Sequence, residues 1–324
     1  MEIAFILSGE NLDLAEAEAV SLLGLTKYRK HGNVLLANMG LAKESLYDRL
    51  AMTKKILEVI VFCETGNLED ELQKLQKSDI KNYYEESFSF RSFRHGAGKG
   101  ISEKKAASII YGKLDDPSVD LKNPKTRFEA HFKDENAFMG KLIWENKDDF
   151  NARKAHKRPK LHPSSINPKV AKACVNLLGI MKGEVVDPFC GSGGILIEAA
   201  LMGLDVIGYD IDKGMLERSS ANLKHYGIKK FTLSCLDSTK LKKRINYVVT
   251  DMPYGKNTRS EGINDVYMGF SDYLRRSLGK RAVIVYSGFD MKGMLEERGL
   301  NVENHFRHYV HGSMMRDIII VKGD

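Results

Sequence analysis

Residues 250–255 read TDMPYG, in which Asp251 closes an apolar run and is followed by Met, Pro, Tyr and Gly. A strand that ends in an ordinary turn would read the same way, because Pro fixes φ, Gly permits positive φ and Asp forms tight local hydrogen bonds. However, Asp251 is not isolated, since Asp187, Asp210 and Asp237 close apolar runs upstream of it. The four carboxylates are therefore candidates for one shared site.

A glycine-rich turn follows the first of these aspartates. Residues 185–194 read VVDPFCGSGG, and the glycines at 191, 193 and 194 let the backbone turn sharply and approach a ligand closely. The third glycine of the dinucleotide-binding pattern G-x-G-x-x-G falls on Leu196, so that pattern is incomplete. A carboxylate at Asp187 would repel a pyrophosphate but suits an ammonium group. Cys190 lies inside this turn, which disfavours a role as a covalent nucleophile.

The elements that must position these residues alternate regularly through the carboxy-terminal half. Apolar runs are separated by helix-like segments, the pattern of βαβ units on a parallel sheet. The five runs are GEVVDPF, LDVIGYD, FTLSCLD, INYVVTD and RAVIVYS. Because the carboxyl ends of parallel strands share one edge, the four aspartates should gather where open α/β folds bind ligands. Two further β-like runs, 301–310 and 315–323, have only a short HGSM connection between them, which predicts a hairpin.

Five parallel strands followed by an antiparallel pair resemble the Rossmann-like seven-stranded sheet of S-adenosylmethionine-dependent methyltransferases. A nicotinamide-binding Rossmann domain would continue with another helical crossover. The resemblance implies S-adenosyl-L-methionine as cofactor, with Asp187 near its ammonium, Asp210 accepting from both ribose hydroxyls and Asp237 accepting from the adenine amine. Any one of these aspartates could instead be a helix N-cap or a turn residue. The expected cofactor-binding residues are Asp187, Pro188, Phe189, Gly191, Gly193, Asp210, Ile211, Asp237 and Ser238.

In such a fold, TDMPYG resembles the D/N-P-P-Y motif by which methyltransferases hold a planar exocyclic amine. An aromatic amine is a poor nucleophile, because its lone pair is delocalised into the ring. The Asp251 carboxylate and a backbone carbonyl near Pro253 would bind its two N–H groups and favour rehybridisation of the nitrogen. Tyr254 would stack on the flipped base, a contact worth about 1–3 kcal/mol. Met252 departs from the motif, but the spacing of the expected catalytic residues Asp251, Pro253 and Tyr254 is kept, and no metal is needed.

Composition sets wider bounds. The 324 residues have room for about two domains, and 50 Lys and Arg against 43 Asp and Glu give a net charge of +7, which suits a polyanionic partner. The four cysteines form no C-x-x-C pair, so neither a zinc site nor a disulfide framework is indicated. No apolar run suits a signal peptide or a membrane span, so we expect a cytoplasmic protein.

The amino-terminal half mixes β-like runs with amphipathic helices, which suggests an α+β unit or two small ones. Between the halves, residues 153–160 read RKAHKRPK, with five basic residues, no acidic one and prolines nearby. This composition predicts an extended linker.

Taken together, these motifs resemble a family of RNA-modifying enzymes. The glycine-rich turn, TDMPYG and the preceding RPKLHPSSINPKVA are similar to the guanine-N2 class of RNA methyltransferases. SFSFRSFRHGAGKGISEKKAASIIYGKL followed by VDLKNPKTRFEAHF is similar to the THUMP domain. The resemblance covers about residues 50–324, and its order and length resemble the archaeal THUMP-domain tRNA guanine-10 N2-methyltransferases. It implies methyl transfer from S-adenosyl-L-methionine to N2 of a tRNA guanine, with position 10 favoured.

The resemblance implies an amino-terminal α/β subdomain plus THUMP-like RNA-binding domain over residues 1–145, a basic linker over 146–165 and a methyltransferase domain over 166–324. Basic side chains of the first two parts would contact tRNA phosphates, although a solvated surface explains such residues equally simply. The expected RNA-binding residues are Arg91, Arg94, Lys99, Lys104, Lys105, Arg153, Lys157 and Arg158.

Several alternatives stay open at this point. The target could be another tRNA or rRNA guanine, such as tRNA G6, or an adenine N6, and a non-catalytic RNA-binding protein is the alternative from another class. The residues do not distinguish one from two methyl additions, the oligomeric state or the need for a small accessory subunit. The roles of His162 and Arg316 are likewise undecided.

Overall fold

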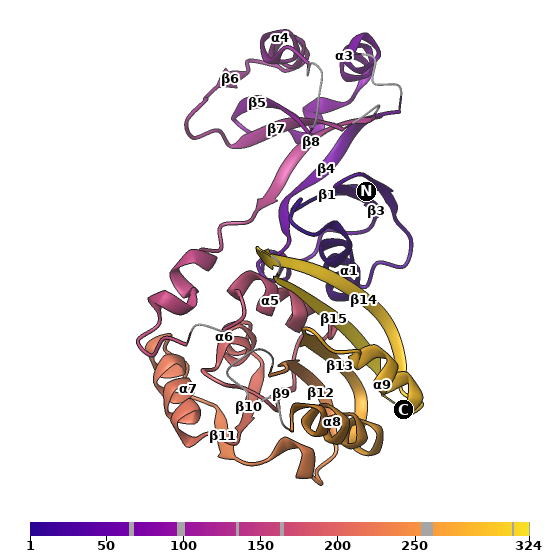
Figure 1. Ribbon diagram of the computed structural model, residues 1–324. Helices are drawn as coiled ribbons and strands as arrows, with labels where there is room; N and C mark the ends of the chain where they lie inside the picture. The colour runs from indigo at the N-terminus through magenta and orange to yellow at the C-terminus, as the bar shows by residue number, and fades with distance from the viewer. Residues whose placement is uncertain are drawn as a thin grey trace. The chain divides into compact units, whose positions relative to one another are not determined.

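The computed structural model describes residues 1–64, 68–95, 101–133, 136–162, 165–253, 262–312 and 314–323. The chain divides into two compact units, whose elements are labelled in Figure 1. Unit 1 comprises Met1–Leu12, Leu25–Asp48 and Thr53–Lys147. Unit 2 comprises Asp13–Gly24, Arg49–Met52 and Asp148–Asp324, so it includes two short pieces of amino-terminal chain.

Unit 1 is built on an eight-stranded sheet with the order β2-β3-β1-β4-β8-β7-β5-β6. Its strands are β1 (Glu2–Leu7), β2 (Arg29–His31), β3 (Val34–Asn38), β4 (Thr53–Cys63), β5 (Ser87–Arg94), β6 (Ser118–Val119), β7 (Thr126–Lys133) and β8 (Asn136–Glu145). Its helices are α2 (Glu44–Tyr47), α3 (Leu68–Lys77), the 3₁₀ turn η1 (Ile80–Tyr83) and α4 (Glu103–Lys113). The mixture of strands and helices is the α+β organisation that the sequence predicts.

Helices α3 and α4 lie side by side over one face of this sheet (Figure 1). Phe88 and Phe90 of β5 join Leu75 of α3 and Ile110 of α4 in one apolar cluster. The alternation in SFSFRSFR explains this placement, because side chains two residues apart leave a strand on the same face. Ser102 caps α4 by accepting from the backbone N–H of Lys105.

Unit 2 is built on a seven-stranded sheet with the order β11-β10-β9-β12-β13-β15-β14. Its strands are β9 (Glu184–Asp187), β10 (Asp205–Asp210), β11 (Thr232–Cys235), β12 (Ile245–Asp251), β13 (Leu278–Tyr286), β14 (Asn301–His311) and β15 (Met314–Lys322). The pairings among β9 to β13 are parallel, and β15 pairs antiparallel with both β13 and β14. The predicted order of five parallel strands followed by an antiparallel hairpin is confirmed.

Helices and 3₁₀ turns complete unit 2: α1 (Leu12–Leu23), η2 (Phe150–Arg153), η3 (Ala155–Lys157), α5 (Pro168–Asn176), α6 (Gly194–Leu201), α7 (Lys213–His225), η4 (Ser238–Lys240), α8 (Ile263–Ser277) and α9 (Met291–Glu297). Tyr267 and Phe270 of α8 and Leu295 of α9 pack against Ile284 of β13 and Ile319 of β15. This apolar contact anchors the strands whose ends carry the candidate site.

A buried carboxylate holds the two amino-terminal pieces in unit 2. Glu18 of α1 is fully buried, and its two oxygens accept the backbone N–H groups of Ala51 and Met52 at 2.7 Å each. The side-chain amide of Asn176 on α5 donates to Glu18 at 2.7 Å and to the carbonyl of Arg49 at 2.7 Å. A domain boundary at residue 166 would assign these two amino-terminal pieces to the first domain, whereas they belong to unit 2. The sequence could not show this, because hydrogen bonds between distant segments leave no periodic pattern.

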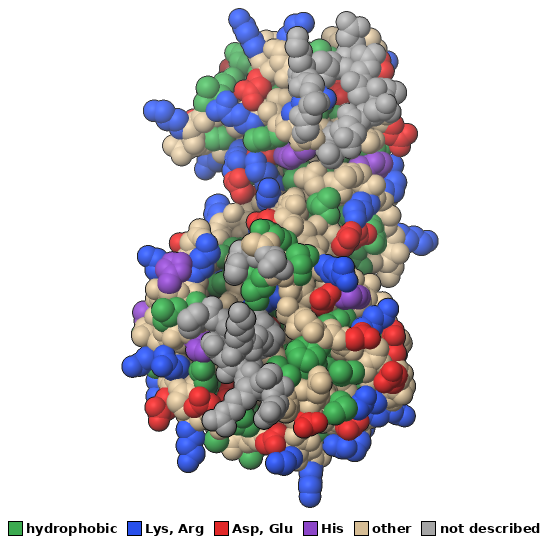
Figure 2. Space-filling view, in the orientation of Figure 1, with side chains coloured by type: hydrophobic (Ala, Val, Ile, Leu, Met, Phe, Trp, Pro, Cys, Tyr) green, Lys and Arg blue, Asp and Glu red, His purple; other side chains and the backbone are tan. Residues whose placement is uncertain are grey.

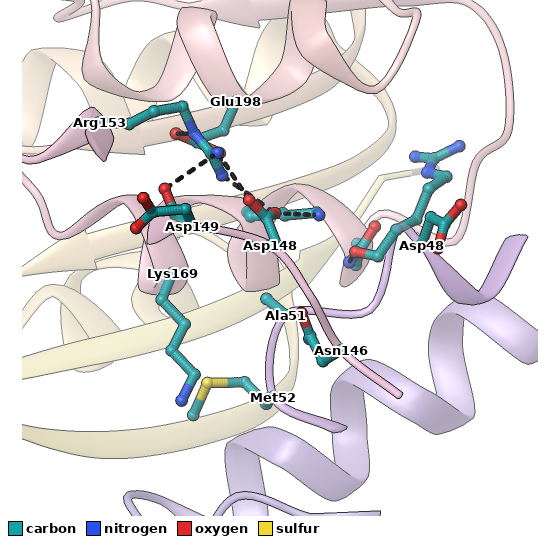
Figure 3. Close-up of polar contacts among 12 residues, drawn as sticks. Asp48, Ala51, Met52, Asn146, Asp148, Asp149, Arg153, Lys169 and Glu198 are labelled. Carbon is teal, nitrogen blue, oxygen red and sulfur yellow. Dashed lines mark hydrogen bonds and ion pairs between the residues drawn. The ribbon is translucent and has the colours of Figure 1, made fainter. Parts of the chain in front are cut away.

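The basic segment between the halves is not the extended linker that its composition predicts. It forms η2 and η3, and Arg153 makes charge-assisted hydrogen bonds to Asp148 at 2.6 Å and to Glu198 of α6 at 2.9 Å (Figure 3). Lys172 of α5 also pairs with Asp148, at 2.6 Å. Arg158 is only 4% exposed, and its Nε donates to the carbonyl of Arg153. The cause is Glu198, an acid inside the apolar helix GILIEAAL, which needs a cationic partner once α6 is buried.

Two findings concern absent features. Within the described residues, no helix combines the length and apolar character needed to cross a membrane. In the same part of the chain, His, Cys, Asp and Glu side chains form no group of three or more that could hold a metal ion. Cys63, Cys174, Cys190 and Cys235 are free thiols.

Candidate active site

The predicted convergence of strand ends is confirmed by the parallel pairing of the sheet. Asp187 is the last residue of β9, Asp210 of β10 and Asp251 of β12, and Asp237 follows the end of β11 by two residues. Because β9, β10, β11 and β12 run in the same direction, these four residues lie along one edge.

The glycine-rich turn at this edge requires glycine for two separate reasons. Gly191 and Gly193 have φ of +49° and +86°, a region that residues with a Cβ rarely adopt. A Cβ on Gly193 would also lie 2.6 Å from the Ser219 hydroxyl of α7. Cys190 is buried in the turn, and burial raises the pKa of its thiol, as suits a packing residue and not a nucleophile.

Asp210 fastens the glycine-rich turn to β10. One carboxylate oxygen accepts the backbone N–H of Gly191 at 2.9 Å, and the other accepts that of Asp212 at 2.9 Å. Burial raises the pKa of Asp210, while these two bonds favour its charged form. Each oxygen has two lone pairs, so the carboxylate retains the capacity to accept two ligand hydroxyls.

Asp187 is 1% exposed and joins β9 to β12. Its Oδ1 accepts the Thr250 hydroxyl at 2.7 Å and the backbone N–H of Phe189 at 3.2 Å. Burial raises the pKa of Asp187 to about 7, and the negative charges of Asp251 and Asp210 add to the shift. A cation bound nearby would therefore stabilise the ionised form.

Asp237 has the contacts of a helix cap, the alternative that its position in the sequence left open. Its Oδ1 accepts the Thr239 side-chain hydroxyl at 2.7 Å and the Thr239 N–H at 3.0 Å, and these bonds hold its pKa below the usual value. The buried Ser238 hydroxyl donates to the Pro188 carbonyl, which joins η4 to the glycine-rich turn. Ile211, in contrast, is 76% exposed beside Asp210 and presents an apolar side chain to solvent.

Asp251 faces Arg316 of β15. The Arg316 Nη2 lies 3.1 Å from Asp251 Oδ2, whereas Asp251 Oδ1 is buried and has no hydrogen-bond partner among the described residues. Burial raises the pKa of Asp251 to about 7, against the opposing effect of the Arg316 charge. The carboxyl group therefore has one oxygen held by a cation and one whose capacity to accept a hydrogen bond is unused within the described part of the chain.

The residues after Asp251 explain the departure from D/N-P-P-Y. Met252 is fully buried, and its backbone N–H donates to the Val285 carbonyl at 2.8 Å, a bond that a proline at this position has no hydrogen to make. The Pro253 carbonyl accepts the Tyr267 hydroxyl at 3.2 Å. Tyr254 lies outside the described residues.

The expected RNA-binding residues of unit 1 do not all share a face. Arg91 and Arg94 are three residues apart on β5, so their side chains leave the strand on opposite sides. Arg91 is exposed and lies 3.3 Å from Glu103, while Arg94 is partly buried and its charge acts on Glu71 of α3. Lys104 and Lys105 are exposed on α4, where Figure 2 shows Lys and Arg side chains at the surface. Lys99 lies outside the described residues.

Of the three expected RNA-binding residues in unit 2, Arg153, Lys157 and Arg158, only Lys157 is exposed. Arg153 and Arg158 are occupied within the fold as described above, so we withdraw them as phosphate contacts. The backbone carbonyl of His162 accepts the Ser165 hydroxyl at 2.8 Å, and the role of its imidazole stays undecided.

Sequence reasoning missed Thr250 and Tyr267 and left Arg316 undecided. Thr250 and Tyr267 each hold an acceptor of the site through one hydroxyl, and Arg316 approaches from a strand 65 residues further along the chain. A basic residue next to an apolar strand, as in MMRDIIIV, was the available signal for Arg316. Nothing in the spacing identifies Thr250.

Comparisons with known proteins agree with this geometry. A family model described as an RMKL-like methyltransferase domain matches residues 155–316, and a second, described as a DNA methylase, matches residues 30–221. The tRNA (guanine(10)-N2)-dimethyltransferase of Methanothermobacter thermautotrophicus is 32% identical over 340 residues, covering 99% of both chains. That of Pyrococcus abyssi is 37% identical over 181 residues, covering 54% of this chain and 55% of its own. The crystal structure of TrmN from Thermus thermophilus has a TM-score of 0.57 at 18% identity over 99% of both chains, a likeness of fold.

The strand order of unit 2 and the match of the methyltransferase model to residues 155–316 agree. The chain is therefore a methyltransferase of the Rossmann-like seven-stranded class. Its relationship to the Methanothermobacter protein runs from end to end. On that ground the chain belongs to the tRNA (guanine(10)-N2)-dimethyltransferase family.

Proposed function

We propose that this protein transfers methyl groups from S-adenosyl-L-methionine to the exocyclic N2 of guanine 10 in tRNA. The structural observation that carries the reaction class is Asp251, a largely buried carboxylate at the same sheet edge as the glycine-rich turn, whose buried Oδ1 has no partner among the described residues. The full-length family relationship supports the tRNA substrate, the position and two successive methylations.

The edge of the sheet fits S-adenosyl-L-methionine. At Gly191 the position that a Cβ would take meets no described atom within 4 Å, so a ligand can approach the backbone of the turn closely there. Asp210 has lone pairs for the two ribose hydroxyls, and the exposed Ile211 offers an apolar surface for the adenine ring. Asp187 supplies negative charge for the ammonium group. The remaining proposed contacts are Pro188, Phe189, Gly191, Asp237 and Ser238. When bound, the cofactor supplies an electrophilic methyl group on a sulfonium centre.

Two acceptors of this chain would hold the guanine amine. Asp251, the last residue of β12, and Pro253 are two residues apart. Arg316 holds the Asp251 carboxylate through Oδ2, and the Tyr267 hydroxyl holds the Pro253 carbonyl. Acceptors held in place stabilise positive charge on the nitrogen without reorganising. A carboxyl group whose pKa is raised to about 7 is also suited to take the proton that the amine releases. Tyr254 remains our proposed stacking partner for the base.

Binding of tRNA would use basic side chains of the THUMP-like part of unit 1. Arg91, Lys104 and Lys105 are exposed there, and Lys157 is exposed in unit 2. Such side chains neutralise phosphates and fix the register of the RNA, while the pocket reads the base. Lys99 and Arg94 stay within this proposal as members of the same THUMP-like segment.

Methylation of two matched tRNA transcripts tests the substrate. Full-length protein with labelled cofactor should methylate a transcript with G10, and a transcript with A10 should incorporate label only at background, because adenine lacks an amine at position 2. Equal labelling of both transcripts would move the target to another nucleotide, such as G6. Cofactor binding without label in any RNA would favour the non-catalytic alternative.

A further inference from the structure

We infer that Arg316 is a positioning residue of the methyl-acceptor site: it binds one oxygen of Asp251, keeps the carboxylate charged and so leaves the other oxygen as the acceptor for the amine. This inference rests on the proposed function, because it assigns the amine to Asp251.

The sheet brings the two residues together across an intervening strand. Asp251 at the end of β12 pairs with Val285 of β13, and Val285 pairs with Ile318 of β15. Because β15 is antiparallel to β13, its first residues lie at the edge where β12 ends, and Arg316 is two residues before Ile318. The predicted hairpin of β14 and β15 thus places Arg316 next to Asp251.

The contact between Arg316 and Asp251 is largely buried and involves only one of the two carboxylate oxygens. Arg316 is 4% exposed, and its Nη2 lies 3.1 Å from Asp251 Oδ2. Desolvating a guanidinium and a carboxylate costs several kcal/mol each, which an exposed pair would avoid. At this place the pair fixes Oδ2 and leaves Oδ1 as the buried acceptor without a partner among the described residues.

The charges around Asp251 show why a cation matters. The Asp251 charge raises the pKa of Asp187 on β9, and it also raises the pKa of Tyr267 on α8 and of Cys174 on α5. Burial alone raises the pKa of Asp251, and the Arg316 charge lowers it. Protonation would convert the acceptor into a donor, so methyl transfer should require the ionised form.

The test compares the pH dependence of kcat in full-length Arg316→Gln, Arg316→Lys and wild-type protein. An adjacent Arg lowers the pKa of a carboxyl group by about 1–3 units, so the acidic limb of Arg316→Gln should move to higher pH by that amount. From a wild-type pKa of about 7, activity at pH 7 should then fall by about 5- to 500-fold and recover as the pH rises. Arg316→Lys keeps the charge and should show a smaller shift in the same direction.

Arg281→Gln is the matched control. Arg281 lies on β13 of the same sheet and pairs with Glu303 of β14 at 2.7 Å, but its strand position pairs with Lys322 at the opposite edge. Its loss should leave the acidic limb unchanged. An unshifted acidic limb in Arg316→Gln, with activity either retained or lost equally at all pH values, would overturn the inference.

A second measurement is independent of turnover and of the identity of the RNA. The ¹³C shift of the Asp251 carboxyl carbon, assigned with Asp251→Asn in Asp-labelled full-length protein, reports its titration directly. Its midpoint should rise in Arg316→Gln and, less, in Arg316→Lys. An unchanged midpoint would refute the role of Arg316 even if wild-type protein methylates tRNA, whereas wild-type protein that methylates no RNA would refute the proposed function alone.

Discussion

Replacing Asp251 with asparagine should lower kcat for tRNA methylation by about 10²–10⁴-fold, the range expected for loss of a positioned acid–base or charge-stabilising group. The amide keeps the shape of the carboxylate but loses its negative charge and its ability to take a proton. Because this interaction strengthens as charge develops on the amine, kcat should fall while the affinities for S-adenosyl-L-methionine and tRNA change little. Single-turnover rates and binding measurements on the same preparation separate the two effects.

Asp272→Asn is the control for Asp251→Asn. Asp272 also pairs with an arginine, Arg298 at 2.5 Å, but its side chain is half-exposed on α8. Its loss should leave kcat unchanged. Wild-type turnover by Asp251→Asn would remove the amine-holding role from this residue.

Replacing Asp210 with alanine should weaken cofactor binding by about 10²–10⁴-fold. Two hydrogen bonds to a charged acceptor contribute about 1.5–3 kcal/mol each, and every 1.4 kcal/mol is a factor of ten in affinity. The same carboxylate holds Gly191 and Asp212 by their N–H groups, so its loss also releases the turn that the cofactor would contact. Calorimetric titration of full-length protein with S-adenosyl-L-methionine measures the loss directly.

Asp290→Ala distinguishes a cofactor ligand from a helix cap. Asp290 caps α9 by accepting from the Gly293 N–H, the structural role that the sequence alone left open for each strand-end aspartate. Its removal should cost about 1 kcal/mol of stability and leave cofactor affinity unchanged. If Asp210→Ala binds the cofactor as tightly as Asp290→Ala, the assignment of Asp210 to the ribose is wrong.

The sheet of unit 2 was predictable because each strand is a short apolar run bounded by a turn and followed by a helix. The runs ending in Asp187, Asp210 and Asp251 carry this pattern almost without interruption. The strands of unit 1 were harder to predict from the sequence. Strand β8 was not predicted, and Gly140 within it lies so close to the Glu58 carbonyl that a Cβ would collide with the backbone, a constraint set by the neighbouring strand alone.

Only those parts of the candidate site that are formed by residues close together in the sequence could be predicted. TDMPYG and the glycine-rich turn placed Asp251 and Gly193, because both depend on local backbone geometry. The partners Thr250 and Arg316 depend on which strands become neighbours, and the basic segment 153–160 was misjudged because charge composition does not reveal a buried acid such as Glu198. Hydrogen bonds and ion pairs between distant segments cannot be recognised from the spacing of residues along the sequence.

Mass mapping of the methylated nucleoside tests the assignment of the amine most directly. Full-length protein incubated with S-adenosyl-L-methionine and an unmodified tRNA transcript should yield N2-methylated guanosine at position 10, passing to the N2,N2-dimethyl form, and Asp251→Asn should yield almost none. A methyl group on a ring nitrogen of guanine, or on another nucleotide while G10 stays unmodified, would contradict the proposed reaction.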